Sequence, residues 1–202
     1  FYVSALENKN INELKQLTII TGDSFSGKTD LLNEISKETC EYSKSINLNT
    51  EVDFKVTEEL KHWFKFVFGV DFILPAKYSY VLRILSVGLN CKEGELFIVE
   101  NPEINLHPRA ISKIGKFFTF LANNGVKVLI ETNSRDIINS ICYEAYLKNI
   151  NNCDVVFYNK TRDNIDKINI NENGKFVNDK HQLVRYPSGF FDANTEELWT
   201  LL

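Results

Sequence analysis

The architecture of this chain follows from one short segment, Gly22-Asp23-Ser24-Phe25-Ser26-Gly27-Lys28-Thr29-Asp30. Its first eight residues fit the pattern G-x-x-x-x-G-K-[ST] without a mismatch. An apolar run, 17–20, precedes the segment, and an amphipathic run, 31–35, follows it. A strand before the loop and a helix after it are the context that this pattern requires, which argues against a chance match. The segment therefore predicts a loop that binds the phosphates of a nucleoside triphosphate.

Each residue type in the segment has a physical task in this interpretation. Glycines let the backbone wrap closely enough for several N–H groups to point at one phosphate, at the N-terminus of the following helix. The Lys28 ammonium is expected to reach the outer phosphates, and the Thr29 hydroxyl is expected to bind Mg²⁺. We therefore predict that residues 22–30 bind the nucleotide.

Composition limits the class of protein. The chain has 202 residues, 44% of them hydrophobic and 25% charged, which is ordinary for one globular domain or for one domain with an appendage. The net charge of −4 argues against a strongly cationic nucleic-acid binder, although a local basic patch stays open. No apolar stretch reaches the length of a membrane span, and no signal peptide is visible. We expect a cytoplasmic protein without a membrane partner.

The cysteines and the chain start carry two further expectations. The four cysteines form no C-x-x-C pair, which argues against zinc and favours free thiols in a reducing compartment. The sequence begins with Phe1 and contains no methionine, so we expect that it is not a complete translation product.

Apolar runs and helical periodicities alternate along the chain and predict a doubly wound α/β sheet. The predicted strands are 17–21, 96–99, 126–130 and 154–158. One predicted helix follows the loop and ends at 37, and four others span 57–67, 79–89, 108–123 and 134–148. Residues 38–56 are polar and predict a loop or insertion. Runs 165–170 and 175–177 flank Asn173-Gly174, a hairpin signal, and 195–202 predict a short last helix.

We therefore expect an α/β fold of the P-loop class, with a mainly parallel sheet flanked by helices and a small C-terminal hairpin and helix. The predicted ATPase domain spans 1–160, with a missing or reduced insert around 38–78. Residues 161–202 are predicted to form a hairpin and tail packed on that domain.

A second chemical element follows the apolar run 96–99, which suits a strand buried on both faces. The run ends at Glu100. An acid at the end of such a strand, downstream of a phosphate loop, can hold Mg²⁺ opposite the phosphates, together with Thr29. The alternative is an ordinary strand-end carboxylate that faces solvent.

The same region carries a family resemblance. Glu100-Asn101-Pro102-Glu103 and Leu106-His107-Pro108 resemble the Walker B region of ATP-binding-cassette-type ATPases of the RecF, structural-maintenance and overcoming-lysogenisation-defect kind. Glu131-Thr132-Asn133-Ser134 resembles the switch segment E-T-H-S of that family, and 186–192 resembles the P-x-G-F-F-D ending of one bacterial subgroup. The resemblance implies Mg-ATP as cofactor, a head-to-tail homodimer and an effector protein as partner.

Several positions depart from the family pattern. Asn101 stands where a glutamate often polarises the attacking water, and an amide can orient a water but cannot take its proton. Glu103 is the nearest carboxylate that could substitute; the alternative role is a structural cap for the turn. Asn133 occupies the position at which this family has a histidine that contacts the γ-phosphate. His107 is either a residue beside the dimer partner or a structural histidine.

The family's Q-loop glutamine is absent between Lys28 and Glu100, and its signature motif is degenerate. Ser79 precedes the predicted helix, where a signature serine should lie, so we expect it to act in trans across the dimer. The alternative, 85–88, falls late in that helix, where no free N–H groups point outward.

The sequence leaves three function classes open. The first is an ATP-dependent switch or clamp with slow hydrolysis. The second is a non-hydrolysing nucleotide-binding module, suggested by the amides at Asn101 and Asn133. The third is another P-loop enzyme such as a kinase, which the short interval between Lys28 and Glu100 would suit. Phe190, Phe191 and Trp199 are expected to pack on the sheet or to form a docking surface.

Overall fold

The structure, a computed structural model, describes residues 13–53, 55–72 and 79–184. A seven-stranded sheet with the order β2-β3-β4-β1-β5-β6-β7 forms its centre. The first five strands in that order are parallel, and β6 and β7 are antiparallel to their neighbours. The predicted α/β fold with a mainly parallel sheet flanked by helices is confirmed.

The strands and helices follow the predicted order closely. The strands are β1 Leu17–Gly22, β2 Ser43–Ile46, β3 Leu96–Glu100, β4 Lys127–Glu131, β5 Val155–Lys160, β6 Ile165–Ile170 and β7 Phe176–Val177. The helices are α2 Lys28–Glu38, α3 Glu58–Phe68, α4 Tyr80–Leu89, α5 Pro108–Asn123 and α6 Arg135–Tyr146, with a 3-10 turn, η2, at Asn152–Asp154.

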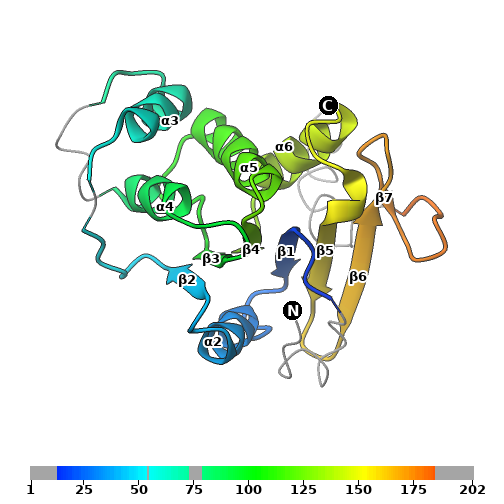
Figure 1. Cartoon of the computed structure of the whole chain (residues 1–202). Helices are drawn as coiled ribbons and strands as arrows, with labels where there is room; N and C mark the ends of the chain where they lie inside the picture. Colours follow the sequence, from blue (N-terminus) through cyan, green and yellow to red (C-terminus); the bar gives the residue numbers. More distant parts are fainter. Residues whose placement is uncertain (1–12, 54, 73–78, 185–202) are drawn as a thin grey trace, which may run out of the picture.

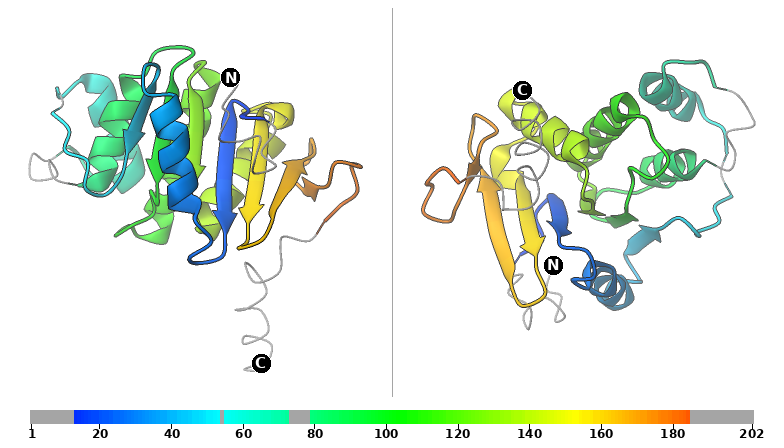
Figure 2. Two further views of the ribbon diagram at one scale, coloured as in Figure 1. Left: turned by 90° about the horizontal axis from the view of Figure 1, so that it is seen from below. Right: turned by 180° about the vertical axis from the view of Figure 1, so that it is seen from behind.

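The helices cover the two faces of the sheet unequally (Figures 1 and 2). Helix α2 lies on one face, where Leu31, Leu32 and Ile35 pack with strand residues in a smaller apolar cluster. Helices α4, α5 and α6 lie on the other face, with α3 packed outside α4 and α5. That side holds the larger apolar cluster. The pattern is the one expected where parallel strands are buried on both faces.

One strand was missed in the sequence. Residues 38–56 were predicted as a loop, but β2 lies within them and pairs in parallel with β3. Its sequence, Ser-Lys-Ser-Ile, has no apolar run, and only Ile46 is buried. An edge strand needs one buried side chain and a free edge on its neighbour, and neither leaves a strong local signal.

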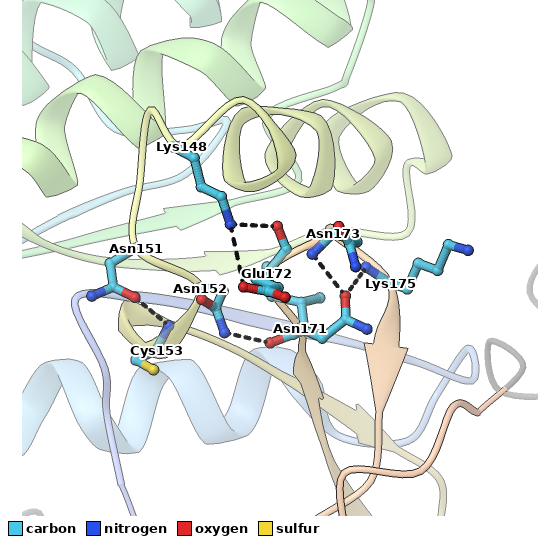
Figure 3. Close-up of polar contacts among 9 residues, drawn as sticks. Lys148, Asn151, Asn152, Cys153, Asn171, Glu172, Asn173 and Lys175 are labelled. Atoms are coloured by element: carbon cyan, nitrogen blue, oxygen red, sulfur yellow. Dashed lines mark hydrogen bonds and ion pairs between the residues drawn. The ribbon is translucent and has the colours of Figure 1, made fainter.

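The predicted hairpin is confirmed at Asn173-Gly174, with β6 and β7 antiparallel. Figure 3 shows how its turn is tied to the connection between α6 and β5. The Lys148 ammonium donates to the Glu172 carbonyl oxygen at 2.8 Å, and the Asn152 amide donates to the Ile170 carbonyl at 3.0 Å. Gly174 has φ +67°, and a β-carbon there would lie 2.2 Å from the Cys142 carbonyl oxygen. The turn therefore packs directly on α6, and β6 extends the central sheet beyond residue 160. The predicted last helix, 195–202, the tail motif 186–192 and the apolar residues Phe190, Phe191 and Trp199 lie outside the described residues.

Candidate functional site

Strand pairing gathers charged side chains around the start of the 22–29 loop. Glu100 on β3 pairs with Glu131 on β4, which pairs with Ile20 on β1. On the other side of β1, Lys160 of β5 pairs with Gly22. Because side chains two residues apart share a face, Glu100, Glu131 and Lys160 point to the α2 side, as do Ile98, Leu129 and Tyr158 before them. The loop joins β1 to α2 at this edge of the sheet (Figure 2, left).

The loop begins in very close contact with β5. Gly22 has φ +132°, and a β-carbon there would lie 2.0 Å from the Lys160 carbonyl oxygen. The Asp23 N–H donates to that same carbonyl at 3.1 Å. At the other end, Gly27 has φ +82° and caps α2 with its backbone. Glycine is required at the first position by space, and it suits both positions because it adopts positive φ without strain.

Lys28 turns its ammonium back into the loop. Its Nζ donates to the carbonyl oxygens of Gly22 at 3.0 Å and Asp23 at 2.6 Å, and the residue is only 6% exposed. Burial lowers the pKa of Lys28, while the charges of Glu131 and Asp23 raise it. A buried ammonium held by carbonyl oxygens at a helix N-terminus is placed to exchange them for an anion.

Thr29 contacts an acid that the sequence analysis did not name as a site residue. Its hydroxyl donates to Glu131 Oε2 at 3.2 Å. Burial raises the pKa of Glu131, while Lys28 and the Thr29 hydroxyl lower it. Glu131, rather than Glu100, is the acid on the strand next to β1. Glu131 carries the same sequence signal as Glu100, because each is an acid that ends a buried strand.

Two loop residues are exceptional in their surroundings. Ser26 is 7% exposed, and its hydroxyl oxygen has no hydrogen-bond partner. A buried hydroxyl without a partner is costly, so this atom is suited to a ligand oxygen. Phe25 is 95% exposed and has φ 61°, which is unusual for a side chain of this size. Asp23, Ser24, Thr29 and Asp30 are also exposed.

The two asparagines lie at the same edge of the sheet. The Asn133 amide lies 3.1 Å from the Thr21 hydroxyl and 3.3 Å from the Gly22 nitrogen, so it touches the start of the loop. The Asn101 N–H donates to the Glu131 carbonyl at 2.9 Å. Asn101 has φ 42°, a left-handed conformation that asparagine accepts more readily than glutamate does.

Glu103 ties the turn after β3 to the segment after β4. Its Oε2 accepts from the Thr132 hydroxyl at 2.8 Å, and its Oε1 accepts from the Asn133 N–H at 3.2 Å. Burial raises the pKa of Glu103, and these hydrogen bonds lower it. Both carboxylate oxygens are engaged, so this geometry favours the structural alternative, although a catalytic role stays a prediction.

Replacing Glu103 with alanine should destabilise the protein by about 1–3 kcal/mol, because the buried Thr132 hydroxyl loses the acceptor of its hydrogen bond. Urea unfolding of Glu103→Ala beside Glu51→Ala, which changes an exposed carboxylate, measures the difference. Equal midpoints for the two variants would contradict the bracing role.

Glu100 is held from α4. The Tyr80 hydroxyl lies 2.5 Å from the Glu100 carbonyl oxygen and 3.2 Å from the Ile46 carbonyl. Burial, followed by the charge of Glu131, raises the pKa of Glu100. A carboxylate whose ionised form is disfavoured in this way is suited to a cation beside it.

The raised pKa of Glu100 gives a pH-dependent prediction. A carboxyl group with a raised folded-state pKa favours folding below its ordinary pKa of about 4.3, and this contribution is lost as the pH rises through the folded value. Glu100→Gln should therefore raise the thermal midpoint at pH 7 in metal-free buffer, and the gain should vanish near pH 4. An increase in the thermal midpoint that is equally large at pH 4 would contradict this explanation.

The remaining predicted residues lie on helix N-termini. Ser79 occupies the N-cap position of α4, as expected, but its side chain makes no capping hydrogen bond. His107 caps α5, where its Nδ1 accepts from the Arg109 N–H at 3.3 Å, which supports the structural alternative. A β-carbon at Gly88 would lie 2.8 Å from Leu121 and 2.9 Å from Phe117, so Gly88 serves the packing of α4 on α5.

Comparison with known proteins adds no support to the family resemblance that the sequence motifs carry. No protein-family model matches this chain, and no curated protein matches it. Within residues 13–53, 55–72 and 79–184, no group of three or more His, Cys, Asp or Glu side chains could hold a metal. Helices in the same part of the chain are too short or too polar to cross a membrane.

Proposed function

We propose that this chain is a P-loop nucleotide-binding domain that holds Mg-ATP on the 22–29 loop and acts as a switch for a partner protein, with slow hydrolysis. The observation that carries the proposal is the buried Lys28 ammonium, cradled by two backbone carbonyls beside the Thr29–Glu131 pair. The sequence pattern and this geometry point to the same chemistry, phosphate on one side and a divalent cation on the other.

The side chains fit the ligand in distinct ways. Lys28 would exchange the carbonyls of Gly22 and Asp23 for phosphate oxygens, and the buried Ser26 hydroxyl would gain a partner. Thr29 would hold the metal, with Glu131 and Glu100 as acids near it. Mg²⁺ commonly uses one or two carboxylates with phosphates and waters, so a three-acid cluster is not required. When bound, Mg²⁺ neutralises charge on the outer phosphates.

Slow hydrolysis follows from the two asparagines. Asn133 can donate a hydrogen bond toward the phosphates but carries no charge. Asn101 can orient a water but cannot take its proton at neutral pH. Glu103 remains the nearest alternative base. A nucleotide that is bound well and cleaved slowly suits a switch, which in this proposal closes a head-to-tail dimer in which Ser79 faces the partner's nucleotide. The partner and the dimer rest on family analogy.

Phosphate release at saturating Mg-ATP tests the proposal, with Lys28→Ala as the control. Wild-type turnover should be slow but should exceed that of the variant. Turnover that does not differ between the two proteins would exclude the hydrolysing form of the proposal.

The second candidate is a non-hydrolysing nucleotide-binding module. The left-handed φ of Asn101 favours it, because a glutamate at this position would carry a backbone cost of about 1–2 kcal/mol. In that case calorimetry should show ATP binding while turnover stays at background. Asn101→Glu combined with Asn133→His should then raise turnover above background, whereas rapid wild-type hydrolysis would exclude this candidate.

A further inference from the structure

A second lysine faces the loop from the side opposite the acids. Lys160 ends β5 and pairs with Gly22, and its carbonyl oxygen anchors the Asp23 N–H. Its side chain points to the α2 side of the sheet. There its Cε lies 3.8 Å from the position of a β-carbon on Gly27, the N-cap of α2. The stem of Lys160 therefore runs past the helix terminus.

The charge of this lysine is weakly compensated within the described residues. Its Nζ lies 3.4 Å from the Thr161 carbonyl, a long contact for a hydrogen bond. No carboxylate of the described residues, 13–53, 55–72 and 79–184, forms an ion pair with it. The Lys160 charge contributes to lowering the pKa of Lys28, so the two cations act on the same region.

The Ser26 hydroxyl and the N-terminus of α2 are two further groups at the loop that could bind a ligand oxygen. The Ser26 hydroxyl is more than nine-tenths buried and has no partner. The first-turn N–H groups of α2 add partial positive charge at the same point. The loop thus has two ammonium groups, a hydroxyl without a hydrogen-bond partner and a helix N-terminus. These groups suit a ligand with more than one phosphate.

From this arrangement we infer that Lys160 is a second phosphate-binding cation, which contacts the nucleotide diphosphate from the β5 side and without the metal. The inference rests on the proposed nucleotide-binding function and deepens it. Strand order separates the two kinds of positive charge. Thr29 and Glu131 face the β4 side of β1, where Mg²⁺ would bind, whereas Lys160 lies on the β5 side. Lys160 can therefore contact the phosphates whether or not the metal is bound.

Calorimetric titration with ADP and ATP, each with Mg²⁺ and with EDTA, tests the inference on four proteins: wild type, Lys160→Met, Lys160→Arg and Lys175→Met. Lys160→Met keeps an unbranched stem and removes the charge, and it should weaken the binding of both nucleotides about tenfold, by the loss of one charge-assisted contact. The loss should be present both with Mg²⁺ and with EDTA, because the contact does not pass through the metal. Lys160→Arg should stay within about threefold of wild type, and the exposed Lys175→Met should not change.

The outcomes separate this inference from the proposed function. Wild-type affinity in Lys160→Met, while Lys28→Ala loses binding, would overturn the role of Lys160 and keep the nucleotide site. A lowered unfolding midpoint of Lys160→Met with unchanged affinity would also overturn it, because the lysine would then be structural. Absence of ATP and ADP binding by the wild type would overturn the proposed function and the inference together.

Discussion

Alanine at Gly22 is expected to destabilise the protein by about 2–5 kcal/mol, the sum of an overpacking cost and a positive-φ cost. The β-carbon would lie 2.0 Å from the Lys160 carbonyl oxygen and 2.7 Å from the Lys160 nitrogen. Both neighbours are backbone atoms of a buried central strand, so neither can move without disturbing the pairing of β1 with β5. The first residues of the 22–29 loop would therefore be displaced from β5.

Gly69→Ala is a matched control for this variant. Gly69 also has positive φ, +74°, but nothing lies within 4 Å of its β-carbon position. It should therefore show only the conformational cost of about 1–2 kcal/mol. Urea unfolding followed by circular dichroism measures both variants. Equal losses for Gly22→Ala and Gly69→Ala would mean that the loop is not pressed against β5.

Replacing Lys28 with alanine should weaken the binding of Mg-ATP by at least about 100-fold, because two or more charge-assisted contacts to phosphate are lost. The ligand-free protein should keep its fold. Burial lowers the pKa of Lys28, which means that its charged form is disfavoured in the folded chain, so removal of the ammonium relieves a desolvation cost. Loss of binding with retained stability is the expected signature.

Lys37→Ala provides the control on the same helix. Lys37 is exposed and lies in the last turn of α2, at the opposite end from the loop. Its removal should leave ATP affinity within about twofold of wild type, as expected for an exposed cation away from the ligand. If Lys28→Ala bound Mg-ATP as tightly as Lys37→Ala, the loop would not be the phosphate site.

Most of the sheet and helix order was predictable because it is encoded locally. The run 96–99 is apolar throughout and became β3, and the periodic segment after Pro108 became α5 with the predicted bounds, 108–123. Such signals need only the neighbours in sequence. The strand β2 has no such signal and was missed.

The site was only partly predictable because its partners come together through strand pairing. The loop, Glu100 and Asn133 each carry a local pattern, but the position of β4 between β1 and β3 is a property of the whole sheet. That order brings Glu131 to the Thr29 hydroxyl and Lys160 to the opposite side of the loop. The left-handed backbone of Asn101 also became visible only in the turn that Glu103 braces.

Calorimetric titration of the wild-type chain with ATP in the presence of Mg²⁺, with phosphate release measured on the same preparation, decides whether this protein is a slow nucleotide-binding switch. We expect saturable binding of one ATP per chain and slow release of phosphate. Absence of ATP binding in a folded preparation would contradict this expectation.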